Sequence, residues 1–566
     1  MSELVKAIIL LALLSGVARA EEAQADEQEA PAPVSTESTV PSTDGETPSS
    51  AQAGTDAPAA ESQPPAPVKQ SRDQNQRLAP YRPVSRFAIG GVRIEAPAQA
   101  ALTWNQYPEI PLDKAGTPFA PSATSDLQLR LGLNIDSLIT REAVFAIAGI
   151  PVFLKAELEA DLVSGVISGG APEVEGFGYP FTNERAEMQL RKGYGQLSFA
   201  SLFTVGGGYM TSHWGLGLVA NDGAHSWSPG CACFRDSRGG DVVKRAFFLA
   251  GPWTSQELAF IGAMDQAERD DMMLAGDSAE QFVLAAIWGY KRPRQLGAYF
   301  VKRRQESAAG GVTEVTVADI FGQWSQRAGA WDLQAAFEGV LIDGTTEWAP
   351  TPEYPESDVV QLAFNLHLEA GRVRSASPWG AVLDLIYASG DQNFEDGVQN
   401  AFAVDPNIEM GLLIHPYILS AQSARAIHNA ADPYLSGRPV EDLERFPSRD
   451  RIQNSWLLAP RLWARPYASL ELYGGPLLAW GDVPLADPLN SKVGGGYPVN
   501  SLGGAGDRWL GTELDLGVRS RSVWHGVEVL FGVEGAVLFP GGAFGGGEAA
   551  LDDPLYAARF LSRLRF

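Results

Sequence analysis

This sequence has few of the residues and motifs on which enzymes depend. It contains only 2 cysteines and 6 histidines in 566 residues. No G-x-S-x-G, P-loop, H-E-x-x-H or Walker-type glycine run occurs in it. No histidine stands with a serine and an aspartate at a spacing that indicates a catalytic triad. The sequence therefore predicts a protein that is not an enzyme and that carries no cofactor.

Long apolar runs are also missing, since no run reaches the roughly 20 residues that a helix needs to span a bilayer. The run from Ala7 to Leu14 follows Lys6 and precedes the small-residue site Ala18-Arg19-Ala20. This order is typical of a secretory signal peptide, which we place at residues 1–20. No cysteine follows the cleavage site, so we expect no lipoprotein anchor.

Residues 21–80 contain hardly any aliphatic or aromatic side chains and consist largely of Glu, Asp, Ala, Pro, Ser, Thr and Gln. Such a segment cannot bury enough surface to offset its conformational entropy, so we expect a disordered acidic spacer in the periplasm. It is either a solvated spacer or an arm that binds a partner. It carries a disproportionate share of the net charge of -25. The acidity therefore says little about the partners of the folded part, and we expect no nucleic acid among them.

Residues 84–566 alternate between apolar and polar side chains in segments of about ten residues, separated by Gly-, Pro- and Asp-rich breaks. The clearest segment places Leu127, Leu129, Leu131, Leu133 and Ile135 on one face of a strand. Strands of soluble sheets average only five or six residues, whereas about ten residues cross a membrane when tilted. Lipid-facing strands must close on themselves. The sequence thus predicts an all-β fold, a single transmembrane antiparallel β-barrel with a disordered N-terminal spacer.

Connection lengths predict the strand count and the orientation. Tight connections are expected at 251–254, 291–294, 328–329, 371–377, 464–467 and 520–522, and long ones at 164–185, 211–240, 265–278, 342–357, 391–452, 481–506 and 540–553. Short and long connections alternate, as periplasmic turns and long extracellular loops do in such barrels. This gives about 18 strands, the first and weakest near 85–95, with 16 as the alternative.

The last eleven residues, Tyr556–Phe566, alternate up to a C-terminal phenylalanine. A soluble sandwich could end this way, but Phe560, Leu564 and Phe566 resemble the signal by which the barrel assembly machinery recognises its substrates. Aromatic residues near strand ends predict an interface girdle that contacts outer-membrane lipids and lipopolysaccharide. The girdle residues are Trp253, Trp288, Tyr290, Trp331, Trp379, Trp463, Tyr467, Trp509, Trp524 and Tyr556.

The charged faces of the strands are expected to line the lumen. The lumen-lining candidates are Arg130, Lys155, Glu157, Glu159, Asp161, Glu338, Glu369, Asp384, Arg461, Glu471, Glu513, Asp515, Arg519, Glu528, Glu534, Arg559 and Arg563. Acidic residues outnumber basic ones, so the summed field does not favour an anionic polymer. Much of this charge is expected to pair across strands.

The long loop 391–452 contains a segment with helical character, from Tyr417 to Ala431. Such a loop either folds inward and narrows the lumen or caps the rim. Near its start, Asp391, Asn393 and Asp396 crowd oxygen ligands that suit Ca²⁺. Their spacing departs from that of an EF-hand, which favours a solvated acidic loop.

The loop 211–240 holds both cysteines, Cys231 and Cys233. In an oxidising compartment they form either a local disulfide or, with His213 or His225, a metal clip. The disulfide is the favoured interpretation, and no metal is expected.

Several sequence segments resemble those of alginate-export barrels, which belong to the group of substrate-specific porins. They are Tyr387–Asp391 opening a long loop, Asn454–Pro466, Gly511–Asp515 and Phe539–Gly541, over about the last 190 residues. The stretch His213–Gly223 looks like one found in uncharacterised outer-membrane proteins. The resemblance implies an outer-membrane channel of a Gram-negative bacterium that passes small hydrophilic solutes or a secreted polysaccharide. The alternatives are a plugged barrel acting as an adhesin or in envelope assembly and, third, a hydrolase at the rim.

Overall fold

The computed structural model describes residues 86–566 apart from positions 90, 139–140, 171–176, 181–186, 224–239, 291, 374, 376, 394–395 and 547–548. The predicted signal peptide, the predicted spacer, His225 and the cysteine pair lie outside the described residues. Among the described helices, none has the length and apolar character needed to cross a membrane.

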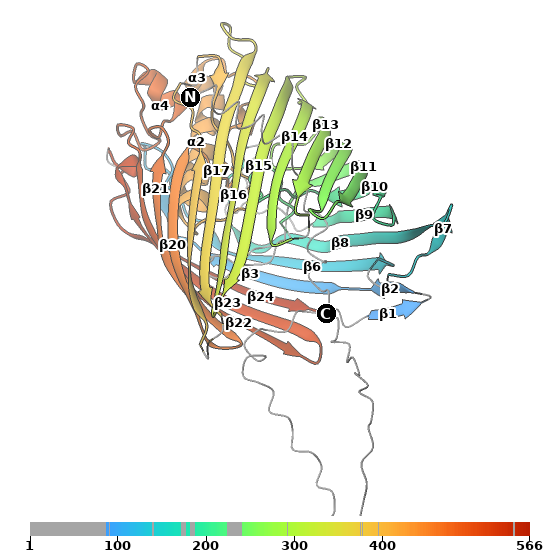
Figure 1. Ribbon diagram of the computed structural model, residues 1–566. Coiled ribbons are helices and arrows are strands. Elements are labelled where there is room, and N and C mark those ends of the chain that lie inside the picture. Colours follow the sequence, from blue (N-terminus) through green and yellow to red (C-terminus); the bar gives the residue numbers. More distant parts are fainter. Residues whose placement is uncertain are drawn as a thin grey trace, which may run out of the picture.

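Eighteen antiparallel strands form one closed barrel (Figure 1), as the alternating segments predicted. In order around the barrel they are β3 (Ala98–Gln106), β6 (Ser122–Asp136), β8 (Ile150–Gly170), β9 (Glu187–Phe199), β10 (Phe203–Thr211), β11 (Val242–Trp253), β12 (Leu258–Arg269), β13 (Ser278–Trp288), β14 (Arg294–Glu306), β15 (Val312–Ala328), β16 (Trp331–Thr346), β17 (Ser357–Arg372), β18 (Trp379–Ala388), β20 (Ser455–Tyr467), β21 (Leu470–Gly481), β22 (Trp509–Trp524), β23 (Val527–Pro540) and β24 (Leu555–Arg565). Strand β24 closes the sheet on β3, from Ala558 opposite Gln106 to Arg565 opposite Gln99.

The two ends of the barrel differ in their connections (Figure 1). At the short-turn end, which also holds Phe566, the strands are joined by turns such as 200–202, 254–257, 329–330, 468–469 and 525–526. At the long-loop end lie the connections 107–121, 212–241, 389–454, 482–508 and 541–554. The predicted alternation of short and long connections is therefore present along most of the chain.

Short elements complete the described chain. The strands are β1 (Arg86–Ile89), β2 (Val92–Glu95), β4 (Ile110–Pro111), β5 (Pro118–Phe119), β7 (Phe145–Ile147) and β19 (Val398–Gln399). The helices are a π-helix (Ile414–Leu419), α2 (Ser420–Ala431), α3 (Pro433–Ser436), a 3-10 turn (Leu443–Arg445), α4 (Pro488–Val493) and a second 3-10 turn (Gly542–Phe544). The helix expected within loop 391–452 is present as the π-helix and α2.

Two expectations about strand boundaries are wrong. The strand that closes the barrel is β3. Residues 86–95 form instead the hairpin β1–β2, which pairs with the end of β6 that lies nearest the short turns. Pro97, which has no backbone N–H, separates the two segments, and its carbonyl oxygen accepts from Gly132 N at 2.8 Å. The turns expected at 464–467 and 520–522 lie inside β20 and β22. After β22 the chain turns instead at His525 and Gly526, which both have positive φ angles.

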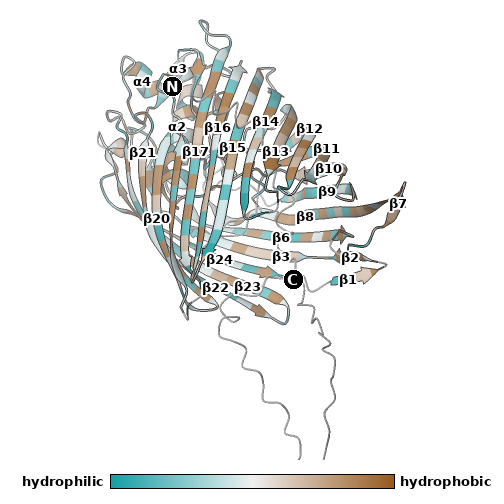
Figure 2. Ribbon diagram, viewed as in Figure 1, coloured by the Kyte–Doolittle hydropathy of each residue, from teal (hydrophilic) through white to brown (hydrophobic). Residues whose placement is uncertain are grey.

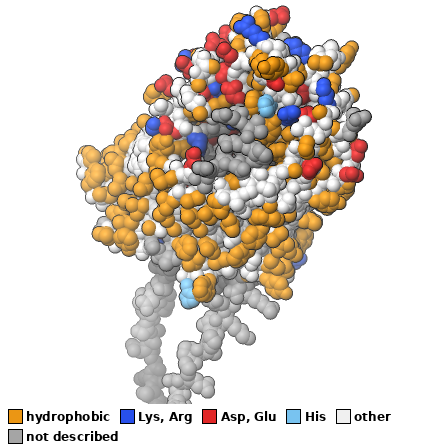
Figure 3. All heavy atoms as spheres, turned by 180° about the vertical axis from the view of Figure 1, so that it is seen from behind, with side chains coloured by type: hydrophobic (Ala, Val, Ile, Leu, Met, Phe, Trp, Pro, Cys, Tyr) orange, Lys and Arg blue, Asp and Glu red, His pale blue; other side chains and the backbone are white. Residues whose placement is uncertain are grey.

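The two faces of the sheet differ in chemistry, and the alternation is visible along the strands in Figure 2. Leu131, Leu158, Leu162, Leu516 and Val533 are between 45% and 59% exposed on the outer surface. Figure 3 shows apolar side chains over the body of the barrel and charged side chains gathered at the long-loop end. Because soluble proteins rarely expose so large an apolar area, the outer surface is suited to lipid.

Aromatic residues mark the edges of this surface. Trp253, Trp288, Trp379 and Trp524 are exposed at the short-turn end. The girdle prediction is wrong for Tyr290 and Trp463, which are buried. Trp463 packs against Val382 and Tyr473, because its position in β20 places it on the face that carries Arg461. Sequence position near a strand end does not reveal on which face an aromatic ring lies.

The final strand has the predicted faces. Phe560 and Leu564 lie on the half-exposed side of β24, and Phe566 is 40% exposed, whereas Arg559 and Arg563 are buried. Recognition of this terminus by the assembly machinery stays a prediction.

Candidate functional site: the barrel interior

The predicted lumen-lining residues all stand on the inner face of the sheet. Glu159 and Glu369 are half-buried, and the other candidates are buried. Most belong to β6, β8 and β20–β24, whose inner faces we call the charged wall. Whether these side chains line a path for solutes stays a prediction.

Cross-strand ion pairs hold the charged wall together. Asp161 accepts two hydrogen bonds from Arg130, at 2.6 and 2.8 Å. Arg519 lies 3.1 Å from Glu471, which also accepts from Arg465 at 2.8 Å. Because an unpaired buried charge costs several kcal/mol, this pairing is a condition of stability.

Further pairs form a chain across three strands. Arg461 donates to Asp384, and Asp384 lies 2.7 Å from Nδ1 of His367. The members come from β20, β18 and β17. Ion pairing thus extends from the charged wall at β20 to β18 and β17, and it compensates part of the charge on the inner face.

The inner faces of β11–β13 differ from the charged wall. Between the buried pair Arg245–Asp265 and the short-turn end, the side chains that point into the barrel are apolar. We call this surface the apolar wall; it consists of Phe247, Leu249, Ala259, Ile261, Ala263, Val283, Ala285 and Ile287. The sequence carries a signal for it, since 246–250 and 282–288 are continuous apolar runs, typical of strands that are apolar on both faces. The predicted lumen-lining residues include none from β11–β13, so the sequence prediction did not describe this region.

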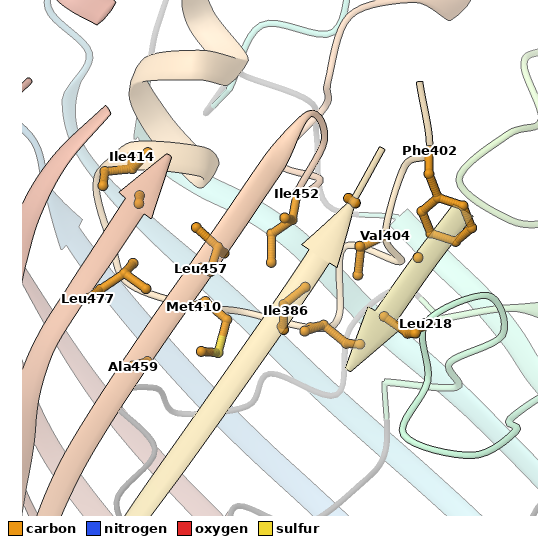
Figure 4. Close-up of a cluster of buried hydrophobic side chains, with 14 of the residues drawn as sticks. Leu218, Ile386, Phe402, Val404, Met410, Ile414, Ile452, Leu457, Ala459 and Leu477 are labelled. Carbon is orange, nitrogen blue, oxygen red and sulfur yellow. The ribbon is translucent and has the colours of Figure 1, made fainter. Parts of the chain in front are cut away.

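The loop 389–454 folds into the barrel, which decides between the two alternatives left open for it. Figure 4 shows Phe402, Val404, Met410 and Ile414 of this loop in one buried cluster with Leu218 of the loop 212–223. Wall residues of β18, β20 and β21 complete the cluster: Ile386, Leu457, Ala459 and Leu477. The half of the interior near the long-loop end therefore has an apolar core.

A carboxylate of the charged wall anchors this loop. Glu513, which is fully buried, accepts hydrogen bonds from the backbone N–H groups of Leu412, Leu413 and Ile414 at 2.5, 2.9 and 3.1 Å. Gly411 precedes them with φ +80°, and a Cβ there would meet the Glu513 carboxyl group at 2.9 Å. The glycine thus permits both the backbone conformation and the close approach.

A second carboxylate anchors the other loop in the same manner. Glu338 of β16 accepts from Leu216 N at 2.5 Å and from Leu218 N at 3.3 Å. Gly215 precedes this pair with φ +55°, and its Cβ position lies 2.7 Å from the Glu338 carboxyl carbon. Each inward loop therefore forms a small nest of backbone N–H groups around one wall carboxylate. The repeated pattern Gly-Leu-x-(Leu/Ile), at 215–218 and 411–414, is the sequence signal for these anchors.

Trp214 fixes the second loop against β14 and β15, next to the strand that carries Glu338. Its ring stacks on Tyr299 with centroids 5.0 Å apart, and its Nε1 donates to Asp319 at 2.8 Å. Gly297 leaves the necessary room, because a Cβ there would lie 2.9 Å from the indole ring.

Salt bridges add to the docking of loop 389–454. Arg559 on the wall lies 2.5 Å from Glu409 of the loop and 2.7 Å from Glu534 of β23. On the rim, Arg445 lies 2.6 Å from Asp277 and Arg451 lies 3.0 Å from Asp271. These salt bridges thus tie the loop to β24 and to the connection 270–277 between β12 and β13.

Several ionisable groups of the docked loop have shifted pKa values, and His415 and Asp405 are two of them. Burial lowers the pKa of His415 to about 3, and its Nε2 lies 3.3 Å from Ser455 Oγ. Burial and the nearby Asp271 carboxylate raise the pKa of Asp405 well above its usual range. Both groups are therefore held neutral in the docked loop at pH values where they would be charged in water.

The proposed ligand sites have these surroundings in the structure. Asp391 accepts from the backbone N–H of Asn393 at 3.0 Å, and Asp396 accepts from Val398 N at 3.1 Å. Among the described residues, no group of three or more His, Cys, Asp or Glu side chains is arranged to hold a metal ion. The solvated acidic loop, with calcium as its less favoured alternative, and the disulfide of Cys231 and Cys233 stay predictions. A rim hydrolase stays a hypothesis without an assigned nucleophile.

Comparisons with known proteins concern the fold. No protein-family model matches the chain, and no curated protein matches it. OccK2 (OpdF) of Pseudomonas aeruginosa is similar with a TM-score of 0.43 and 12% identity, covering 84% of this chain and 97% of that chain. OccAB1 of Acinetobacter baumannii has a TM-score of 0.46 and 10% identity, with coverages of 84% and 97%. The outer membrane protein OpdK of P. aeruginosa has a TM-score of 0.40 and 10% identity, with coverages of 83% and 99%. At these values the likeness assigns neither a family nor a substrate, and the resemblance to alginate-export barrels stays a prediction.

Proposed function

We propose that this chain is an outer-membrane channel for small hydrophilic solutes, narrowed by its two inward loops. The observation that carries the proposal is the charged wall. Burying paired charges is often no more stabilising than an apolar filling of the same volume. The same barrel builds an apolar wall and an apolar core elsewhere. A polar path for solutes along the charged wall is therefore the best explanation for the charged side chains on this part of the inner face.

The apolar outer surface and the connection lengths support an orientation. Hydrocarbon would contact the outer faces of the strands, and the long loops would face the cell exterior. Phe566 and the N-terminal spacer would then lie in the periplasm. Lipids, lipopolysaccharide and the barrel assembly machinery would be the partners of such a protein.

A small solute is favoured over a polysaccharide. Nearly all charged side chains of the wall are buried, so few of them are accessible to a polymer along its length. Acidic residues outnumber basic ones among the wall candidates, which opposes an anionic polymer. Export of a glycan is therefore the weaker form of the proposal.

A plugged barrel that binds surface partners is the second candidate. It is favoured by the apolar core between the inward loops and by apolar side chains exposed beyond the rim. These are Tyr434 and Leu435 on α3, with Val493 and Tyr497 at and after the end of α4, and their exposed fractions range from 56% to 98%.

Planar-bilayer recordings of the refolded protein separate the two candidates. A channel gives discrete current steps, and deletion of residues 391–452 is expected to increase their size because it removes much of the apolar core. A barrel that stays silent both before and after this deletion would favour the partner-binding function.

A further inference from the structure

The outer surface of the barrel carries a groove at the long-loop end. It has a volume of about 410 Å³ and is lined by Leu385, Trp456, Leu457, Leu458, Trp480, Gly481 and Arg508. These residues come from the upper ends of β18, β20 and β21 and from the last residues of loop 482–508. The groove thus lies where the apolar surface ends and the polar loops begin.

Four aromatic side chains form a row at the level of this groove, and two of them line it. Tyr387, Trp456, Trp480 and Trp509 stand opposite one another on four neighbouring strands. The rings of Tyr387 and Trp456 have centroids 4.3 Å apart, and those of Trp480 and Trp509 are 4.9 Å apart. Aromatic rings at this depth suit a ligand with an apolar part in the membrane and a polar part at its surface.

Arg508 supplies a positive charge at the polar end of the groove. Its Nε donates to the carbonyl oxygen of Gly481 at 3.2 Å, which orients the guanidinium group, while its side chain is 56% exposed. The Asp482 carboxylate lies 3.9 Å from the guanidinium group, and the Asp507 carboxylate accepts from the backbone N–H of Arg508 at 2.6 Å.

Asp482 already has three other donors: Gly390 N at 3.1 Å, Tyr387 Oη at 3.3 Å and Trp456 Nε1 at 3.4 Å. These neutral donors satisfy much of the hydrogen-bonding capacity of the Asp482 carboxylate without Arg508. The guanidinium group keeps N–H donors that can bind an anion.

We propose that this groove binds a phosphorylated glycolipid of the outer leaflet. An acyl chain would occupy the space between Trp456 and Trp480, and a phosphate group would bind Arg508. The match of charge favours an anionic head group, and the position at the long-loop end favours the outer leaflet. The inference rests on the proposed orientation of the barrel, but it does not require that the lumen conduct.

Binding of purified lipid A to the full-length protein in detergent tests the proposal. Native mass spectrometry would count the bound lipid molecules and give an apparent affinity. We expect Arg508→Glu to weaken binding about tenfold or more, since it replaces a charge-assisted hydrogen bond with repulsion. Arg508→Lys should keep most of the affinity, and Trp480→Ala should weaken it less than Arg508→Glu.

A matched control stands at the other end of the barrel. Arg294 lies over the ring of Trp324 at 6.0 Å, so Arg294→Glu makes the same charge reversal near a tryptophan at the short-turn end. This variant should bind lipid A as the wild type does. If both glutamate variants lose the same affinity for lipid A, or if neither loses any, the bound molecules are only the lipid that surrounds any membrane protein. Either result would overturn the proposal. Equal affinity for phosphatidylglycerol, or for lipid A without its phosphates, would overturn the assigned lipid class.

Conductance of the same preparations in bilayers of phospholipid alone separates this inference from the proposed function. Current steps without specific lipid A binding would remove only the lipid site. Specific binding by a silent barrel would keep the lipid site and contradict the channel.

Discussion

The charged wall and the apolar wall are both buried inside one barrel, yet they achieve this in different ways. The apolar wall needs only side chains that fit, such as Ile261 and Val283. The charged wall must provide each ion with a partner, as it does for Arg130 and Asp161. An apolar interior is the simpler solution for stability, so the charged wall is the part of the interior whose composition calls for a functional reason.

The inward loops use both kinds of surface. Their apolar side chains pack against the barrel interior, whereas their backbone N–H groups bind single wall carboxylates, Glu338 and Glu513. Apolar packing has little direction, but a hydrogen bond to a carboxylate fixes a position. The carboxylates therefore determine where the loops dock, and the apolar contacts supply much of the stability.

The largest effect is expected where pairing in the charged wall is broken. Arg130→Met leaves the fully buried Asp161 without its bidentate partner and should lower the free energy of unfolding by about 3–5 kcal/mol. The double variant Arg130→Met/Asp161→Leu should recover to within about 1 kcal/mol of wild type, because an apolar pair needs no partner. Denaturant titration in phospholipid vesicles measures both. If the double variant is as unstable as the single one, the comparison between the two walls fails.

A smaller effect is expected at the loop anchor. Glu513→Ala leaves three buried N–H groups without an acceptor and should destabilise the docked loop by about 2–3 kcal/mol. Proteolysis within 389–454 should become faster and single-channel current larger. Glu513→Gln keeps one acceptor oxygen and should show an intermediate effect. Glu471→Gln, which changes the wall but no loop contact, serves as the control. Unchanged cleavage in Glu513→Ala would mean that packing alone positions the loop.

The docked loop should also respond to acid through His415. Its pKa is lowered to about 3 by burial, so the undocked loop takes up a proton below pH 6.5 while the docked loop does not. As the pH falls from about 6 to about 4, docking of the loop therefore becomes less favourable by roughly 1.4 kcal/mol per pH unit. The raised pKa of Asp405 acts in the opposite sense, because its contribution is lost as the pH rises. The test is therefore the difference in proteolysis rate between wild type and His415→Asn, which should grow as the pH falls. A difference that does not change with pH would show that His415 does not titrate on undocking.

The smallest effect is expected for an exposed ion pair outside the walls. Arg304 lies 3.3 Å from Glu314, with side chains about half exposed. Arg304→Ala should change the free energy of unfolding by less than about 1 kcal/mol, because solvent screens exposed pairs. The same titration as for Arg130→Met measures it. A loss as large as that of Arg130→Met would mean that burial does not distinguish the two kinds of pair.

Sequence alternation located the strands whose two faces differ in polarity. Strand β6, with Leu131 outside and Arg130 inside, is such a case, as are β17, β22 and β23. Sequence alternation is weak in strands whose two faces both carry apolar or small side chains. It therefore misplaced the first strand, because β3 is rich in alanine, and it overlooked the inner faces of β11–β13.

The boundaries of turns were less predictable than the strands. The segment Ser520-Arg521-Ser522 has the composition of a turn, but its backbone pairs with β23. The positive φ angles of His525 and Gly526, which make the actual turn, depend on the register of the two strands. Local composition does not contain this register.

The sequence by itself determined the membrane-type barrel, because a period of two over about ten residues separates an apolar face from a charged one. It also contained the residues that became the charged wall. Only the tertiary structure decided which carboxylates pair with arginines and which hold the loops, since Glu338 and Leu216 lie more than a hundred residues apart in the chain. Closure of the sheet brings them together, and the enclosed volume then determines how far a loop of given length can fold inside.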